Sequence, residues 1–233
     1  MHDNIGLFLS KRAHLDPTVE AFVDVASGLR LSYHELNQRA NQTAHFLRGL
    51  GIKRGDRVAL LMLNCPAYLE LFFGLAKIGA VTVPLNIRLV ADELAYIIQD
   101  SGSRLLMFGP EFTSITEALQ NKLDQIKSVE NFIFVAGPDS SDADRPDFAL
   151  DYEGLRLSSP THEPEISAGQ EEMLYIMYTS GTTGLPKGVV HTHDSAIWAC
   201  ITWAATGEFR LYDRYLLILP LYHVGALTPV TAN

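Results

Sequence analysis

The chain has 233 residues, of which 47% are hydrophobic, and it carries a formal net charge of −9. This composition excludes an intrinsically disordered chain and is sufficient for one large domain with a sizeable core. The acidic balance and the lack of a basic stripe argue against nucleic acid and against an anionic membrane surface as partners. An anionic substrate would therefore need local positive groups.

The two cysteines, Cys65 and Cys200, lie in apolar surroundings without a Cys-x-x-Cys spacing. We interpret both as buried free thiols, which fits a reducing cytoplasm. The first residues include Asp3, Lys11 and Arg12 and do not resemble a signal peptide. No apolar run reaches the length of a transmembrane helix. The expected location is the cytoplasm, with no transmembrane segment and no nucleic acid bound.

Strand and helix patterns alternate through the first part of the chain. The first expected elements are a helix over 5–15, strands over 19–25 and 29–31, and a helix opened by a capping box from Ser32 to Glu35. A strand over 57–62, a helix from Pro66 to about Lys77 and a strand over 80–83 follow. The last are a helix over 92–100, a strand over 104–108, a helix over 112–127 and a strand over 132–135. The continuous apolar run over 57–62 is typical of a strand buried on both faces. The alternation predicts an α/β fold with a mostly parallel sheet covered by helices.

Two stretches of loop composition follow. Residues 137–147 predict an acidic surface loop, and residues 158–169, with two prolines, predict a linker between two halves of the fold. We therefore expect a first α/β subdomain over 1–170, and the start of a second, incomplete α/β subdomain over 171–233.

Eleven residues from Tyr178 to Gly188, with the sequence YTSGTTGLPKG, organise the second half of the chain. Three glycines, four Ser and Thr hydroxyls and one lysine lie here between two strand-like runs. Glycine lets the backbone take positive φ and approach a ligand, successive N–H groups form an anion-binding nest, and the hydroxyls and Lys187 can contact phosphate oxygens. The loop is longer than common hairpin turns. Its spacing excludes a Walker A loop, because Pro186 and Gly188 occupy the positions of the second glycine and the Ser or Thr. We predict a loop that wraps a polyphosphate.

Five histidines outside this loop were considered as metal ligands. His34, His45 and His162 have no partner at ligand spacing, and we interpret them as solvent-side residues. His191 and His193 form a His-x-His pair that could bind a metal, but no third ligand is near in the sequence. A metal site is therefore the weaker interpretation of this pair.

A helix is expected after the loop, with Thr192 or Asp194 as its cap. Its inward face is expected at Ala196, Ile197, Cys200 and Ile201. Residues 215–219 then predict a buried strand that leads into residues 220–225, with the sequence PLYHVG. A histidine at the carboxyl end of a buried strand, here His223, lies where open α/β sheets bind ligands. A core or capping histidine is the alternative.

The stretch from Tyr178 to Gly188 resembles the phosphate loop of the adenylate-forming (AMP-binding) superfamily. This superfamily includes acyl- and aryl-CoA synthetases, adenylation domains of peptide synthetases and firefly-type luciferases. Residues 73–81 and 84–86 resemble it more weakly, and the PLYHVG segment resembles its second core motif. The resemblance implies attack of a carboxylate on the α-phosphate of ATP, which gives an acyl-adenylate and pyrophosphate, and then transfer of the acyl group to coenzyme A.

The resemblance also implies roles for single residues. The residues expected to hold the pyrophosphate portion of ATP are Thr179, Ser180, Gly181, Thr182, Thr183, Gly184 and Lys187, with Thr182 meeting Mg²⁺. Lys187 and His223 would lie at the reacting groups, with His223 beside the substrate carboxylate and acyl pocket. Amino-acid-activating members have an aspartate in place of His223, so the resemblance favours a simple carboxylic acid such as a fatty acid.

Members of this superfamily are much longer than 233 residues. We therefore expect the N-terminal portion of an acyl-CoA synthetase that uses ATP, Mg²⁺ and coenzyme A. We expect the chain alone to be inactive. We also expect it to self-associate through uncovered apolar surface. Two alternatives stay open, an aryl-CoA ligase or luciferase-like enzyme, and a non-catalytic fragment that binds a nucleotide or a partner.

Overall fold

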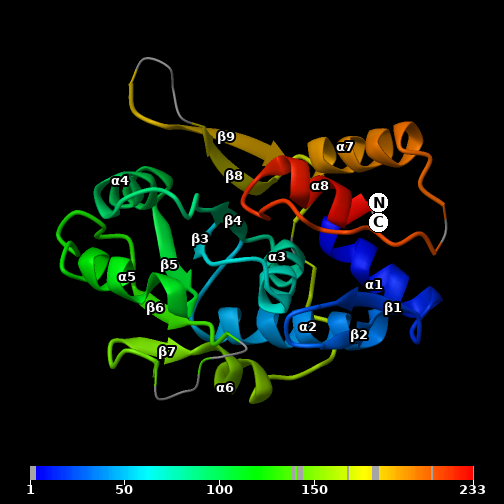
Figure 1. The fold of residues 1–233 in the computed structure, drawn as a ribbon, viewed down its shortest axis with the longest axis horizontal. Helices are drawn as coiled ribbons and strands as arrows, with labels where there is room; N and C mark the ends of the chain where they lie inside the picture. The colour runs from blue at the N-terminus through cyan, green and yellow to red at the C-terminus, as the bar shows by residue number, and fades with distance from the viewer. Residues whose placement is uncertain are drawn as a thin grey trace.

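The computed structural model describes residues 4–137, 140, 144–166, 168–179, 184–210 and 212–232. Its centre is a seven-stranded sheet with the strand order β7-β6-β5-β3-β4-β8-β9 (Figure 1). The strands are β3 (Arg57–Leu61), β4 (Val81–Pro84), β5 (Ser103–Phe108), β6 (Asn131–Phe134), β7 (Ala149–Asp151), β8 (Met173–Thr179) and β9 (Lys187–Thr192). Neighbouring strands pair in parallel except for β8 and β9, which are antiparallel. The predicted α/β fold with a mostly parallel sheet is confirmed.

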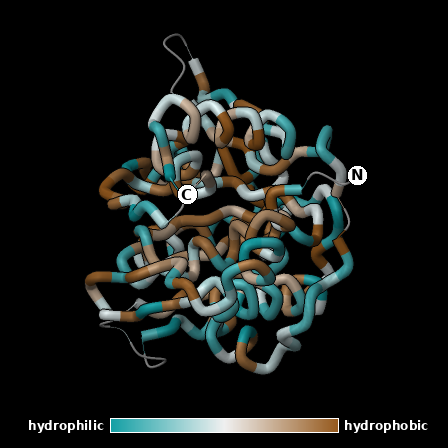
Figure 2. Tube along the Cα trace, turned by 90° about the vertical axis from the view of Figure 1, so that its right-hand side faces the viewer, coloured by the Kyte–Doolittle hydropathy of each residue, from teal (hydrophilic) through white to brown (hydrophobic). Residues whose placement is uncertain are grey.

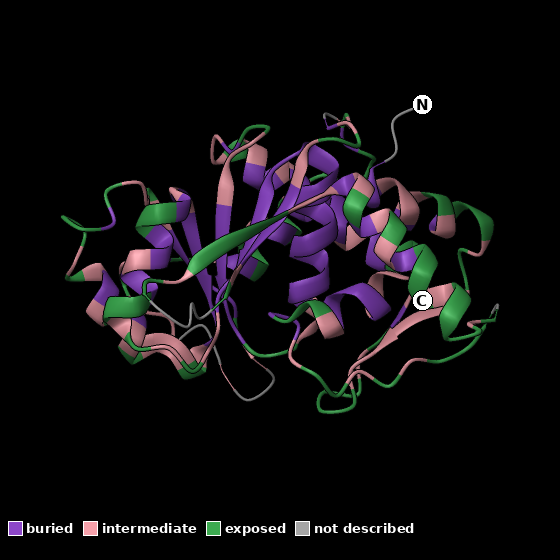
Figure 3. Ribbon diagram, turned by 90° about the horizontal axis from the view of Figure 1, so that it is seen from above, coloured by how far each residue is buried: buried purple, intermediate pink, exposed green. Residues whose placement is uncertain are grey.

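Helices cover both faces of this sheet. They are α1 (Ile5–Leu15), α2 (Tyr33–Gly49), α3 (Pro66–Ile78), α4 (Ala91–Ser101), α5 (Thr113–Gln120), α6 (Tyr152–Leu157), α7 (His193–Thr206) and α8 (Val224–Ala232). In β3, Val58 and Leu60 pack into a cluster with residues of α2 and α3, whereas Ala59 and Leu61 pack with α4 and α5. All four side chains are buried, which confirms that this strand is covered on both faces. Figure 3 shows the buried residues concentrated in the sheet and in the helices that lie on it.

The start of α2 is an example of local sequence that determines local structure. A hairpin of β1 (Glu20–Val23) and β2 (Arg30–Ser32) precedes the helix. The Ser32 N–H donates to Glu35 Oε2 (2.8 Å), and the Glu35 N–H donates to Ser32 Oγ (3.3 Å). This reciprocal capping box is the predicted one, and it satisfies two backbone donors at the helix start.

Apolar and polar positions alternate along many segments of the chain trace (Figure 2), as expected for elements that bury one face.

The helix expected over 112–127 is shorter than predicted. A 3₁₀ turn, η1 (Pro110–Phe112), precedes α5, and α5 ends at Gln120. Turn hydrogen bonds then replace the helical pattern, since the Lys122 N–H donates to the Leu119 carbonyl and the Gln125 N–H to the Lys122 carbonyl. These turns bury Ile126 and lead into β6, where the chain must return to pair with β5.

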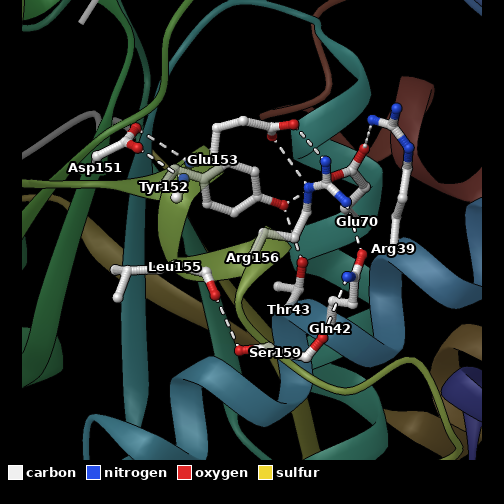
Figure 4. A network of polar contacts seen from close by, with 11 residues as sticks. Arg39, Gln42, Thr43, Glu70, Asp151, Tyr152, Glu153, Leu155, Arg156 and Ser159 are labelled. Atoms are coloured by element: carbon white, nitrogen blue, oxygen red, sulfur yellow. Dashed lines mark hydrogen bonds and ion pairs between the residues drawn. The ribbon is translucent and has the colours of Figure 1, made fainter.

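A buried polar network holds α6, which the sequence pattern did not indicate (Figure 4). The Tyr152 hydroxyl donates to Glu70 Oε2 (2.7 Å) and lies 2.9 Å from Thr43 Oγ1. Arg156 Nη1 donates to Gln42 Oε1 (2.7 Å), and Arg156 Nε lies 3.7 Å from Glu70 Oε2. Glu70 and Arg156 are both buried, and Arg39 Nη1 also donates to Glu70 Oε1 (3.0 Å), so each buried charge has several polar partners and the short helix is fixed by tertiary contacts.

The expected linker over 158–169 is bound closely to α2. Four side chains of α2 contact backbone carbonyl oxygens of this segment: Asn41 that of Thr161, Gln42 that of Ser159, His45 that of His162 and Arg48 that of Glu165. The rings of His45 and His162 also lie 4.5 Å apart. His162 is exposed, and His45 is partly buried against it. The sheet continues across residue 170 through β8, and the division into subdomains at that position stays a prediction.

The prediction of a buried strand over 215–219 is wrong. This segment is extended, but it pairs with no strand among the described residues. Leu216 and Ile218 are 75% and 77% exposed. The sheet neighbour of β8 is β9, so this apolar run has no strand partner among the described residues.

None of the helices in the described ranges is long and apolar enough to cross a membrane.

Candidate functional site

The predicted phosphate loop connects the two strands of an antiparallel hairpin. In the register of β8 and β9, Thr179 lies opposite Lys187, so these two residues form the base of the loop. Thr179, Gly184 and Lys187 are all exposed. Four of the predicted site residues, Ser180, Gly181, Thr182 and Thr183, lie outside the described residues. The hairpin therefore places the described ends of the loop at the surface, next to each other.

Two of the three glycines of the predicted loop, Gly184 and Gly188, lie within the described residues. Neither Gly184 nor Gly188 has a positive φ. A Cβ atom on Gly188 would lie 2.8 Å from Ile176 Cγ2 and 3.1 Å from the ring of Tyr178. Gly188 is therefore needed for close contact with β8, while Gly184 has open space around it.

Tyr178 fixes the end of β8 against the rest of the domain. Its hydroxyl donates to Asp100 Oδ2 of α4 (2.6 Å). Burial, together with the neighbouring Asp100 carboxylate, raises the pKa of Tyr178, so the hydroxyl stays protonated and remains a donor. The hairpin thus projects from a strand that is anchored to α4.

The helix after the hairpin begins as expected at a Thr192 cap. The Ser195 N–H donates to Thr192 Oγ1 (3.1 Å), and the Thr192 N–H donates to Ser195 Oγ (2.9 Å). Ala196 and Cys200 of α7 are buried, but Ile201 is 50% exposed, so the inward face is narrower than predicted. Both cysteines are free thiols, with Cys65 partly buried and Cys200 buried, and burial raises the pKa of Cys200 to about 11.

The two histidines of the His-x-His pair have different neighbours. His191 stacks on Tyr175 with ring centroids 4.4 Å apart. His193 is fully buried, and its Nδ1 accepts a hydrogen bond from the Ile5 N–H (3.1 Å). Burial lowers the pKa of His193 to about 4, so it is a neutral acceptor near pH 7. Over the described part of the chain, no group of three or more His, Cys, Asp or Glu side chains could hold a metal ion.

The PLYHVG segment forms a turn before α8. Leu221 and Tyr222 are buried, whereas His223 is exposed, with its ring 4.5 Å from that of Tyr222. The His223 N–H donates to the Pro220 carbonyl (3.0 Å), and the His223 carbonyl accepts from the Ala226 N–H (3.0 Å). The backbone around His223 is therefore well fixed, and its side chain is directed away from the core.

Asn64, which no sequence pattern indicated, ties this turn to the sheet. Asn64 follows β3, and its Nδ2 donates to the Leu219 carbonyl (2.9 Å) while its Oδ1 accepts from the Leu221 N–H (2.8 Å). Because β3, β4 and β8 are parallel, their carboxyl ends lie at one edge of the sheet, where open α/β sheets bind ligands. The turn with His223 and the start of the phosphate loop are therefore directed to the same edge of the sheet, although His223 does not follow a sheet strand. No hydrogen bond within the described residues joins the His223 side chain to Thr179, Gly184 or Lys187.

Comparisons with known proteins agree with this arrangement. A family described as AMP-binding enzyme matches residues 9–232. The long-chain-fatty-acid–CoA ligase FadD13 of Mycobacterium tuberculosis is 44% identical over 227 residues, which cover 97% of this chain and 42% of the relative. The inhibitor-bound N-terminal domain of FACL13 from the same organism has a TM-score of 0.89 at 41% identity and covers all of this chain and 55% of that one.

A more distant structure, ATP-bound MatB from Rhodopseudomonas palustris, has a TM-score of 0.83 at 26% identity, over 100% of this chain and 44% of that one. The chain thus spans less than half the length of the curated relative it matches at 44% identity. The match to the family model covers nearly every residue, including the hairpin and the PLYHVG turn. The chain belongs to the AMP-binding enzyme family.

Proposed function

We propose that the protein is an AMP-forming acyl-CoA synthetase that activates a fatty acid. A carboxylate oxygen attacks the α-phosphorus of ATP, the bond from that phosphorus to the bridging oxygen breaks, and pyrophosphate leaves. The thiol sulfur of coenzyme A then attacks the acyl carbon of the adenylate, the thiol proton passes to water, and AMP leaves. The observation that carries this proposal is the hairpin with Thr179 opposite Lys187, in a chain 44% identical to a fatty-acid–CoA ligase.

The loop would bind the β- and γ-phosphates of ATP. The hydroxyls of Thr179, Ser180, Thr182 and Thr183, and the backbone N–H groups of this stretch, would donate to phosphate oxygens. Lys187 is exposed at the base of the loop and would supply a local positive charge in a chain whose net charge is −9. Because charge builds on phosphate oxygens as pyrophosphate leaves, donors held in place before the reaction stabilise the transition state.

Magnesium would neutralise phosphate charge when it is bound. It is usually held by substrate phosphates with only one or two protein oxygens. The chemistry of the loop fits this requirement, because a single hydroxyl, that of Thr182, is the protein ligand we assign. Among the described residues, no group of three or more His, Cys, Asp or Glu side chains could hold the ion instead.

His223 would line the site of the carboxylic acid. It is exposed at the same sheet edge, and buried Tyr222 beside it supports its backbone. No carboxylate occurs in residues 220–225, so an amino acid's ammonium group would lack a counter-ion from this segment. The segment therefore favours an acid without an amine, and we propose a fatty acid. Residues 1–170 and 171–233 would be parts of two subdomains of a cytoplasmic enzyme.

Acid-dependent exchange of labelled pyrophosphate into ATP tests this proposal. The protein produced from its complete reading frame is incubated with ATP, Mg²⁺ and one acid at a time, namely palmitate, ferulate or leucine. Palmitate should support exchange, and added coenzyme A should yield palmitoyl-CoA. Exchange with ferulate alone would favour the aryl-CoA ligase alternative. Exchange with none of the acids would contradict the proposal and favour a protein that only binds a nucleotide.

A further inference from the structure

Asn64 holds together two parts of the chain that are far apart in sequence. Its side-chain amide uses both of its polar atoms, with Nδ2 donating to the Leu219 carbonyl (2.9 Å) and Oδ1 accepting from the Leu221 N–H (2.8 Å). The residue between them is Pro220, which has no N–H group. Asn64 thus satisfies the backbone on both sides of the proline, as a paired strand residue would.

The segment before this contact has little else to fix it. Residues 215–218 make no backbone hydrogen bond with any described residue. Leu216 and Ile218 are mostly exposed. The first firm attachment after this run is the amide of Asn64, and buried Leu221 and Tyr222 follow at once. Asn64 therefore supplies the polar attachment of the turn to the chain after β3, beside the apolar packing of Leu217 and Leu221 against the core.

The turn in its part determines where His223 lies. The His223 N–H donates to the Pro220 carbonyl, so the His223 backbone is one hydrogen bond away from the pair of residues that Asn64 holds. We propose that Asn64 is a positioning residue, which holds the Pro220–His223 turn at the carboxyl edge of β3 and so sets where His223 meets the substrate carboxylate. This inference rests on the proposed function.

Three substitutions test the inference in the protein from its complete reading frame. Asn64→Ala removes both hydrogen bonds, and Asn64→Asp keeps the acceptor for Leu221 but removes the donor to Leu219. Asn121→Ala is the matched control, because Asn121 is exposed at the end of α5 and its side chain makes no hydrogen bond in the described structure. Hydrogen exchange of the Leu221 amide measures the turn itself, and steady-state pyrophosphate exchange gives separate KM values for palmitate and ATP.

Asn64→Ala should speed exchange of the Leu221 amide and raise the KM for palmitate by about tenfold, the effect of losing hydrogen bonds of ordinary net strength. The KM for ATP should stay within about twofold of the parent, since the hairpin is anchored separately through Tyr178. Asn64→Asp should leave the Leu221 amide protected and give a smaller rise in the KM for palmitate. Asn121→Ala should match the parent in every measurement.

Parental Leu221 exchange and parental KM for palmitate in Asn64→Ala would overturn the inference. A rise of both KM values together would overturn it as well, since that result indicates general loosening. If Asn64→Ala does not fold, Asn64→Asp decides alone, and an unchanged KM for palmitate in that variant counts against a positioning role. If none of the acids supports pyrophosphate exchange by the parent, the proposed function fails. Hydrogen exchange of the Leu221 amide still shows whether Asn64 holds the turn.

Discussion

Replacing Glu163 by Gln should destabilise the domain, because Glu163 is the charged partner of a buried lysine. The side chain of Lys77 is fully buried, and its Nζ donates to Asn37 Oδ1 (2.6 Å), Asn41 Oδ1 (2.6 Å) and Glu163 Oε2 (2.8 Å). Burial lowers the pKa of Lys77, and the hydrogen bond and charge of Glu163 oppose that effect. Without the carboxylate, the ammonium keeps neutral acceptors but loses its only counter-charge within the described residues.

The size of the expected loss in the free energy of unfolding depends on how far the two charged side chains are exposed. Hydrogen bonds to charged groups contribute roughly 1.5–3 kcal/mol, but the Glu163 side chain is 45% exposed, so solvent screens part of this. Glutamine also keeps one acceptor. We expect a loss of about 1–2 kcal/mol in the free energy of unfolding at pH 7. For a chain of this size, that corresponds to roughly 2–8 °C in the melting temperature.

The same variant makes a prediction about pH. Burial by itself raises the pKa of Glu163, but hydrogen bonds from Asn37 and Lys77 outweigh it and lower the pKa below the ordinary value. The stabilisation is therefore present above the pKa of the unfolded chain and is lost as pH falls through the lowered folded-state pKa. Urea unfolding of the parent and Glu163→Gln at pH 7 and in steps toward pH 3 should show the gap closing. Glu117→Gln, a change on the exposed face of α5, is the control. Equal stability of parent and Glu163→Gln at pH 7 would refute the reasoning.

Three further predictions concern other parts of the domain. Gly188→Ala should cost about 1–3 kcal/mol, because its Cβ would overlap Ile176, whereas Gly184→Ala, in open space, should cost much less; a urea midpoint unchanged in Gly188→Ala would contradict this. Burial lowers the pKa of His193 to about 4, so its contribution to the free energy of unfolding is fully present above the unfolded-state pKa of about 6.5. As pH drops toward 4, the free energy of unfolding should fall by on the order of 2–3 kcal/mol. A His193→Gln variant should lack this dependence of stability on pH, and the same dependence in both proteins would refute the prediction. The exposed Leu216, Ile218 and Trp198 should make the 233-residue chain bind a hydrophobic dye and self-associate, and a dye-free monomer in sedimentation would count against it.

Signals that act over a few residues were readable from the sequence. The Ser32 to Glu35 capping box and the Thr192 cap formed as predicted, because their hydrogen bonds involve only neighbouring backbone. Short elements were missed for the opposite reason: α6 is six residues long and depends on Glu70, which lies far away in the sequence. Lys77 is a similar case, since helix periodicity does not indicate a lysine enclosed by partners from other elements.

The apolar run over 215–219 shows a further limit. Composition indicates that such a run prefers a β conformation, but it does not tell which strand will accept its hydrogen bonds, and here no described strand does. At the candidate site, the loop between two strand-like runs followed from its glycines and hydroxyls, but the antiparallel pairing of those strands was not predicted. Asn64 was not predicted either, because a polar residue after a buried strand has no local partner, and its two contacts are more than 150 residues away.

The central claim is that the loop between β8 and β9 binds the phosphates of ATP for acid activation. Replacing Thr182 and Thr183 together by Ala removes two donors proposed to contact the β- and γ-phosphates, each worth roughly 1.5–3 kcal/mol. Palmitate-dependent pyrophosphate exchange by the protein from its complete reading frame should then fall by about a hundredfold or more. Urea unfolding should change little, because the described ends of the loop, Thr179 and Gly184, are exposed. Exchange at the parental rate by the folded double variant would contradict the phosphate-loop assignment and the function proposed from it.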